Sequence, residues 1–200
     1  MTMTGLLSRV PLEPTADGPP WLAGLRRDAA ARLHASGFPG KKHEAWRFTS
    51  VREVVDTPFV RAVPDHGVVA KVDAALGDDH TYRLVIAGGR PLLEQAGTPP
   101  EGISVRSLAD VLANDPAIVE PVLGKLVAGE HFAALSNALF EDGVVIVVSR
   151  GADVATPVHV VHASTSTDAP TASYPRVVVI AEPGSRATLV ESFIDTSEEG

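Results

Sequence analysis

The sequence predicts an α+β protein with two regions of different character. Up to about Phe140, apolar residues recur three or four positions apart, a spacing that is typical of amphipathic helices. After Asp142 the pattern changes to short β-branched runs separated by Gly, Pro, Ser and Thr. Two of these runs, which begin at Val144 and Val177, resemble each other closely and are the first sign of a structural repeat.

The first expected helix covers residues 21–34. Its apolar positions share one face, and Gly37 lies just beyond its end as a stop signal; these positions are Leu22, Leu25, Ala29 and Leu33. A β-rich run at 82–87 is followed by Gly88-Gly89, which predicts a strand and a tight turn.

Three further helices are expected between Ser107 and Phe140, mainly from their cap residues. Ser107 with Asp110 three positions later has the form of a capping box. Asp115-Pro116 places a cap residue before a first-turn proline. The third helix follows from apolar residues at helical spacing between His131 and Phe140. The chain up to Phe140 is therefore expected to be mainly helical.

The β-rich region contains an internal echo. Val144–Val147 recurs as Val177–Ile180, and Gly151 recurs as Gly184 at the same offset. Short strands and turn glycines that recur in this way predict either stacked rungs of a parallel β-helix or a β-sandwich.

Composition narrows the classes of function. The formal charge is -8, and no basic cluster is larger than the pairs Arg26-Arg27 and Lys41-Lys42, so we expect no nucleic-acid binding. No apolar run approaches the roughly 20 residues that cross a bilayer, so we expect no membrane partner and a cytoplasmic location.

The residue types also limit the chemistry. The chain has no cysteine, which excludes a thiolate nucleophile, a disulfide or a Cys-ligated metal or cluster within these residues. His159 and His162 are the nearest pair of potential metal ligands, but odd spacing in a strand sends them to opposite faces. Neither a GxGxxG nor a Walker pattern occurs. We therefore expect no catalytic residue, no metal site and no bound cofactor in this chain.

One segment is more specific. Residues 37–59 read GFPGKKHEAWRFTSVREVVDTPF, which resembles the segment that opens the SufB/SufD family of iron–sulfur cluster assembly scaffold proteins. The positions of that family pattern are filled here by Pro39, Lys42, Glu44, Trp46, Arg47, Phe48 and Thr49. Downstream, GADVATPVHVVH and PGSRATLVESF resemble the first rungs of the family's β-helix.

The resemblance implies a domain order. A flexible leader at 1–19 would precede a mainly helical cap at 20–140, and residues 141–200 would begin a right-handed parallel β-helix that is truncated here. It also implies a non-catalytic scaffold subunit of a SufBCD complex, in which SufC hydrolyses ATP and the complex assembles an iron–sulfur cluster. Contacts with SufB and SufC, and the residues that build the cluster, are expected downstream of Gly200.

The motif residues have a structural interpretation. We expect Trp46 and Phe48 to anchor the cap and Glu44 to pair with a nearby Lys or Arg. Two alternatives stay open: a polysaccharide-active β-helix enzyme and a β-sandwich interaction module. The enzyme would need carboxylates on a shared face, for which Glu191 and Asp195 are the candidates.

Overall fold

The computed structural model describes residues 5–6, 10, 18–127, 130–164 and 168–196, so most of the predicted leader at 1–19 lies outside the described residues. The helices are α1 (Pro20–Ser36), α2 (Arg52–Asp56), α3 (Val68–Leu76), α4 (Leu108–Asn114) and α5 (His131–Leu139), with 3₁₀ turns η2 (Glu44–Trp46), η3 (Leu93–Gln95) and η4 (Pro116–Ile118). The strands are β1 (Val60–Arg61), β2 (Tyr82–Ala87), β3 (Arg90–Pro91), β4 (Ile103–Ser107), β5 (Gly143–Val148), β6 (Val158–Ser164), β7 (Thr171–Ala172), β8 (Arg176–Ala181) and β9 (Leu189–Asp195).

The chain divides into two compact units, and each is built from separate stretches of sequence. Unit 1 contains Met1–Val60, Leu112–Phe140 and Ala169–Thr171. Unit 2 contains Arg61–Val111, Glu141–Asp168 and Ala172–Gly200. The segment 61–111, which lies within the predicted cap, thus belongs to the same unit as the later strands. The predicted domain boundaries at 19/20 and 140/141 stay a prediction.

Unit 1 is organised around the packing of α1 on α5. The buried face of α1 carries the residues expected from its periodicity, including Leu22, Ala29 and Leu33. Gly37 ends the helix with φ +64°, and its N–H donates to the Leu33 carbonyl oxygen at 2.8 Å. This positive φ explains why glycine follows the helix. The first predicted helix is therefore confirmed.

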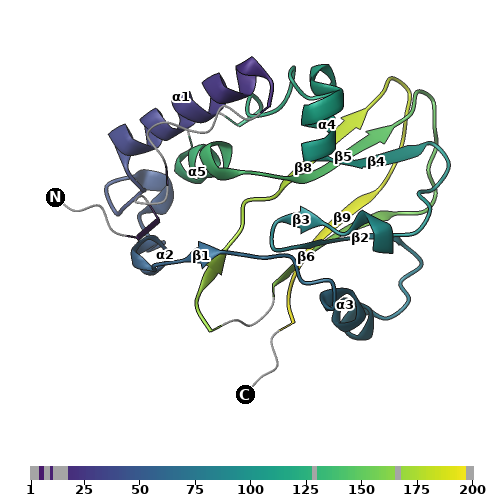
Figure 1. Cartoon of the computed structure of the whole chain (residues 1–200), viewed down its shortest axis with the longest axis horizontal. Helices are drawn as coiled ribbons and strands as arrows, with labels where there is room; N and C mark the ends of the chain where they lie inside the picture. The colour runs from purple at the N-terminus through teal and green to yellow at the C-terminus, as the bar shows by residue number, and fades with distance from the viewer. Residues whose placement is uncertain (1–4, 7–9, 11–17, 128–129, 165–167, 197–200) are drawn as a thin grey trace. The chain divides into compact units, whose positions relative to one another are not determined.

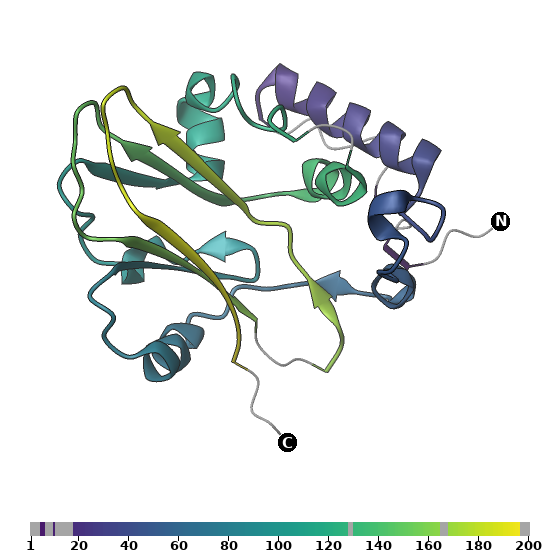
Figure 2. The same ribbon diagram turned by 180° about the vertical axis from the view of Figure 1, so that it is seen from behind.

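Unit 2 contains two sheets that face each other, as Figures 1 and 2 show. One has the strand order β3-β2-β6-β9 and the other β4-β5-β8. Alternate residues of both sheets point into a shared apolar core; these are Tyr82, Leu84, Ile86, Ile103, Val144, Ile146, Val148, Val154, Val158 and Val160. The period of two in these strands places their apolar side chains on the inward face.

The two similar sequence segments, Val144–Val147 and Val177–Ile180, pair directly with each other as neighbouring strands. β5 and β8 are parallel, with Val144 opposite Val177, and a further parallel bridge joins Asp153 to Arg186 at the same offset. β6 and β9 are also parallel, but Val158 lies opposite Leu189, so their offset is slightly shorter. The strands β8 and β9 therefore lie beside β5 and β6, and the connection from β8 to β9 is slightly shorter than that from β5 to β6.

The outer face of the β3-β2-β6-β9 sheet is covered by α3 (Figure 1). Val68 and Val72 of α3 pack against the sheet residues Val85 and Val161. β6 is consequently buried on both faces, and most of its residues are buried, including His159. Among the described residues, no helix is both long enough and apolar enough to cross a bilayer.

Several local predictions are confirmed, and several elements were missed. The strand at 82–87, its Gly88-Gly89 turn and the strands that begin near Val144 and Val177 are present. The Ser107 cap is also present, since the Asp110 N–H donates to the Ser107 Oγ at 3.0 Å. The helix expected after Asp115 is only the short turn η4. Sequence reasoning missed α2, α3, β1, β4 and β7. The additional strands make the region before Phe140 less helical than expected.

The start of β5 provides a test of the parallel packing. Gly143 lies opposite Arg176, and a Cβ at Gly143 would overlap the Arg176 carbonyl oxygen. We expect Gly143→Ala to lower the free energy of unfolding by about 1–3 kcal/mol through overpacking. Gly151 has φ +69° but no neighbouring atom, so Gly151→Ala should cost only about 1 kcal/mol. Urea denaturation measures both; a smaller loss for Gly143→Ala would contradict the close approach.

Candidate functional site

Strand β6 carries two histidines that face opposite sides of its sheet. His159 is buried on the face that α3 covers, together with Val161. His162 shares the other face with Val158 and Val160, which belong to the core between the two sheets. The two rings therefore have different neighbours, as their odd spacing predicted.

His159 links two segments that are distant in sequence. Its Nδ1 lies 2.9 Å from Asp79 Oδ2, and its Nε2 lies 2.9 Å from the Ser192 Oγ. Because an ionised carboxylate can only accept, the Nδ1–H donates to Asp79, and the Nε2 and the Ser192 hydroxyl share the second hydrogen bond. The chain of bonds joins the loop before β2 to β6 and to the edge strand β9.

Asp79 is held ionised by its neighbours. The Thr81 hydroxyl, 2.7 Å from Asp79 Oδ1, contributes most to holding the pKa of Asp79 far below its ordinary value, and burial partly opposes this shift. His159, the Thr81 N–H and Arg83 lower the pKa of Asp79 further. The Arg83 guanidinium lies 3.0 Å from Asp79 and also binds Asp73 at 2.6 Å. Asp79 thus carries its charge at neutral pH.

A hydroxyl, an imidazole and a carboxylate in this order form the relay that activates serine in hydrolases. Such a relay also needs a substrate cavity beside the hydroxyl and donors for an oxyanion. The described cavity of about 460 Å³ opens elsewhere, and its walls include neither Asp79, His159 nor Ser192. We therefore interpret the relay as a structural hydrogen-bond network that links β9 and the 78–81 loop to β6.

That cavity lies at the ends of β2, β6 and β9. His162 and Phe193 line it, and their rings stack at 4.6 Å between centroids and 8° between planes. The His162 Nε2 lies 2.7 Å from Glu191 Oε1, and the Ser164 hydroxyl lies 3.3 Å from Asp195 Oδ1. Glu191 and Asp195, the carboxylates considered for polysaccharide cleavage, are thus each engaged by a different side chain.

The described residues offer little to hold a metal ion. Within the ranges that the structure describes, no group of three or more His, Asp and Glu side chains could hold one. His159 and His162 are each bonded to a different carboxylate. The expectation of no metal site and no cofactor stays a prediction.

The motif at 39–49 lies in unit 1, between α1 and α2. Pro39 is buried, whereas the other motif side chains are half-buried or exposed: Lys42, Glu44, Trp46, Arg47, Phe48 and Thr49. The Trp46 ring lies 5.4 Å from the Phe132 ring of α5, which supports an anchoring role for the indole. Their assignment to the family pattern stays a prediction.

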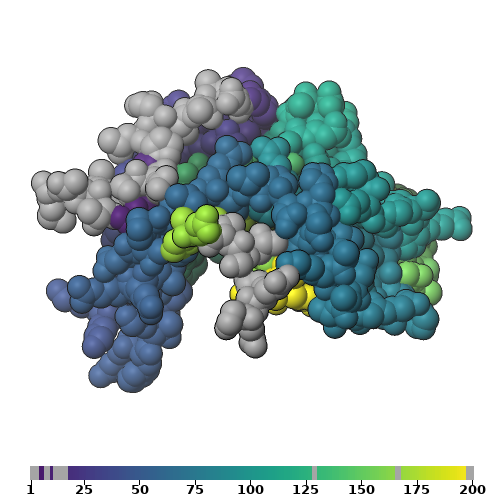
Figure 3. All heavy atoms as spheres, turned by 60° about the horizontal axis from the view of Figure 1, so that its bottom comes forward, coloured from purple at the N-terminus to yellow at the C-terminus, as the bar shows by residue number. Residues whose placement is uncertain are grey.

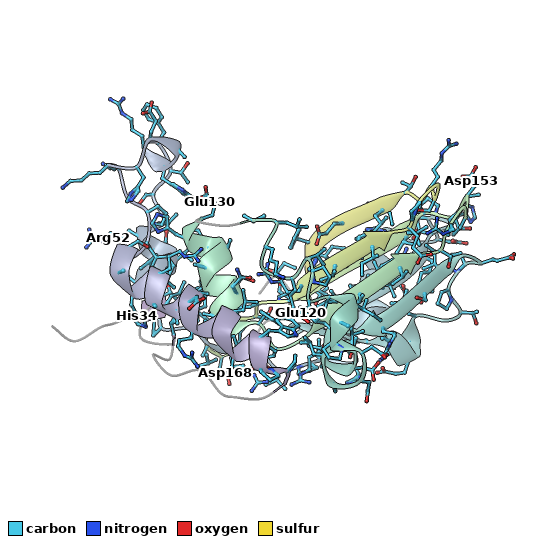
Figure 4. The ribbon with its side chains drawn as sticks, turned by 90° about the horizontal axis from the view of Figure 1, so that it is seen from above. His34, Arg52, Glu120, Glu130, Asp153 and Asp168 are labelled. Atoms are coloured by element: carbon cyan, nitrogen blue, oxygen red, sulfur yellow. The ribbon has the colours of Figure 1, made fainter. Side chains whose placement is uncertain are left out.

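Two expectations about this motif were wrong. Phe48 does not anchor the cap, because 94% of it is exposed. The ion pair expected for Glu44 is not among the ion pairs of the described residues. Phe48 follows the turn η2 and is open to solvent, whereas Trp46 contacts Phe132; Figure 4 shows this segment standing out from α1 and α5. The sequence pattern identified the residues but not the direction of each side chain.

Comparison with known proteins gives a consistent result. Residues 81–160 match the family model described as SufBD protein N-terminal region. The chain is also similar to SufBD-family proteins over most of its length. The resemblance to this family is therefore confirmed, whereas the family model does not reach the 37–59 segment.

Two curated SufBD relatives cover most of the chain. An iron–sulfur cluster assembly SufBD family protein of Synechocystis is 27% identical over 176 residues, which is 86% of this chain and 39% of the relative. The iron–sulfur cluster assembly protein SufD of Escherichia coli is 28% identical over 185 residues, which is 88% of this chain and 41% of that protein. The chain therefore spans about two fifths of the length of each relative.

Sequence reasoning missed the relay of Asp79, His159 and Ser192. A local signal existed for one part of it: Asp79 two positions before Thr81 is a pattern in which a carboxylate caps a turn. The rest depends on pairing between strands. Only the β6–β9 register brings Ser192 within reach of His159.

The relay predicts an acid-sensitive part of the stability. The pKa of Asp79 is lower in the folded than in the unfolded state, so ionised Asp79 stabilises the fold above about pH 4 and this contribution is lost as pH falls below that value. We expect Asp79→Asn to be less stable than the parent chain at neutral pH, with the difference shrinking on acidification. Urea unfolding midpoints of the variant and the parent chain, measured at neutral pH and at a pH below about 4, test this expectation. The exposed Asp28→Asn is the control. A difference independent of pH would contradict it.

The two aromatic residues of the motif should behave differently. Trp46→Ala removes the contact with Phe132, and we expect it to lower the free energy of unfolding by about 1–2 kcal/mol. Phe48→Ala removes an exposed ring and should change it by no more than about 0.5 kcal/mol. Thermal unfolding compares them, and a larger loss for Phe48→Ala would show that its ring is covered within the chain.

Proposed function

We propose that this chain belongs to a SufD-like, non-catalytic scaffold subunit of a SufBCD-type complex that assembles iron–sulfur clusters. The observation that carries the proposal is the similarity to SufD of Escherichia coli over 88% of the chain. SufB and SufC homologues would be its partners, and SufC would hydrolyse ATP. The cluster would be the cargo of the complex, which would work in the cytoplasm.

The arrangement of the strands supports a finer proposal about the fold. In β5–β6 and β8–β9 the chain makes two successive passes whose strands pair in parallel in both sheets. We propose that these passes are the first two coils of a right-handed parallel β-helix. Solenoids of this kind bury a continuous core because each coil covers its neighbour.

The second coil presents a surface that a further coil would fit. β8 and β9 are edge strands of their sheets as described. Val179 is 44% exposed and Phe193 is 77% exposed, and both lie on the inward faces of their strands, in line with Val177 and Leu189 of the core. A third pair of strands added at these edges would cover both side chains and satisfy the free backbone groups of the edges.

The proposed function is tested with the protein as its own gene encodes it. A tagged copy expressed in the source organism should co-purify SufB- and SufC-type subunits in comparable amounts, with an untagged strain as control. The purified protein alone should not hydrolyse ATP, and ATPase activity should follow the SufC-type subunit. Recovery of the tagged protein without either subunit would overturn the proposed function.

A further inference from the structure

The segment between α1 and α2 stands out from unit 1. We call residues 41–49 the hook; Figure 4 shows this segment standing out from α1 and α5, and the space-filling view of Figure 3 shows the indigo-to-blue region that contains it as a lobe. Phe48 is 94% exposed, which is the largest exposure among the large hydrophobic residues that are described. A single exposed apolar side chain is common on protein surfaces, so a binding role for Phe48 depends on the residues that surround it in the hook.

The hook has a defined backbone. The His43 N–H donates to the Gly40 carbonyl oxygen at 2.8 Å, and the Gly40 N–H donates to the His43 Nδ1 at 3.1 Å. Further on, the Trp46 N–H donates to the His43 carbonyl oxygen at 2.9 Å, and the Thr49 N–H donates to the Trp46 carbonyl oxygen at 3.1 Å. Consecutive turns of this kind hold Phe48 in one place before any partner arrives, which lowers the entropy cost of binding.

The base of the hook is fixed to α5 by aromatic contacts. The Trp46 ring lies 5.4 Å from Phe132, and the His43 ring meets His131 edge-on at 5.0 Å. Phe48 is 94% exposed, so its ring contributes little to the packing of unit 1.

The chemistry at the tip fits a protein partner with an acidic surface. The Arg47 guanidinium lies 5.4 Å from the Phe48 ring centroid, and Lys41 and Lys42, in the same segment, are exposed. Glu44 is the only carboxylate within residues 41–49. Aromatic and Arg side chains together are the residues that most often dominate the binding energy of protein interfaces.

The negative charge of the chain as a whole argues against an extended polyanion as the partner of the hook. With a formal charge of -8, the chain as a whole repels nucleic acids and anionic membranes at long range. A compact partner that touches only the hook comes within about 8–10 Å of its cations, and charges farther away are screened at physiological salt. A local acidic surface is therefore the better complement.

We propose that the hook docks onto a partner protein by seating Phe48 in an apolar pocket rimmed by carboxylates, which Arg47, Lys41 and Lys42 would contact. This inference rests on the proposed function, because it takes the partner to be another subunit of the assembly complex. It adds a contact in the N-terminal region to those expected downstream of Gly200.

The test measures the affinity of the gene-encoded protein for purified SufB- and SufC-type subunits of the same organism. Phe48→Ala should weaken binding to one of them by about tenfold or more. Arg47→Glu should weaken it as well and reduce the dependence on salt. The controls are Leu126→Ala, which truncates another exposed apolar side chain, and Arg32→Glu, which makes the same charge change on α1. Circular dichroism confirms that each variant is folded.

The outcomes separate the two proposals. Unchanged affinity in Phe48→Ala and Arg47→Glu, with binding by the parent protein intact, overturns the hook inference and leaves the proposed function standing. Equal weakening by the controls also overturns it, because the effect would then not be specific to the hook. Failure of the parent protein to bind either subunit overturns the proposed function together with the docking contact. Phe48-dependent binding to anionic vesicles or single-stranded DNA, without subunit binding, would overturn the protein-docking inference and assign the hook to a polyanion.

Discussion

The double pairing of β6 is the constraint on which unit 2 depends. One edge of β6 pairs in parallel with β2, which lies far earlier in the sequence, and the other pairs in parallel with β9. Its inner face contributes to the core between the sheets, and its outer face receives α3. Both candidate histidines lie on this strand. Any change that shifts its register by a single position would exchange the environments of His159 and His162 and expose the apolar residues of both faces.

The relay on the outer face adds specificity to that arrangement. A buried imidazole needs partners for both nitrogens, and only one register supplies Asp79 on one side and Ser192 on the other. Removing Asp79 or Ser192 leaves one nitrogen of the buried His159 without its partner, which costs more than the bond itself contributes. The relay therefore stabilises the native strand pairing and also disfavours neighbouring registers, in which His159 would lose these partners.

How far the sequence could predict this molecule depends on the range of the interactions. α1 and the strands β5 and β8 carry their own periodicity, and the turn at Gly88-Gly89 needs positive φ, so local patterns were sufficient. α3 begins with two adjacent valines, which favour strands locally, and its helical state is fixed by packing on the sheet. The Asp79, His159 and Ser192 relay depends on strand register. The direction of Phe48 follows from the turn at η2, which the motif alone does not specify.

Unit 2 is built from segments that alternate along the sequence with those of unit 1, and this has a consequence during synthesis. Tyr82 of β2 pairs with Val158 of β6, so β2 leaves the ribosome well before the strand that will cover its edge. At the usual rate of translation, the interval is on the order of 4–15 seconds. Throughout it, a strand with Leu84 and Ile86 destined for the core is open to unwanted pairing with other nascent chains. The edge of β2 therefore needs protection, for example by chaperones, while the chain is being synthesised. In the folded protein β6 covers this edge.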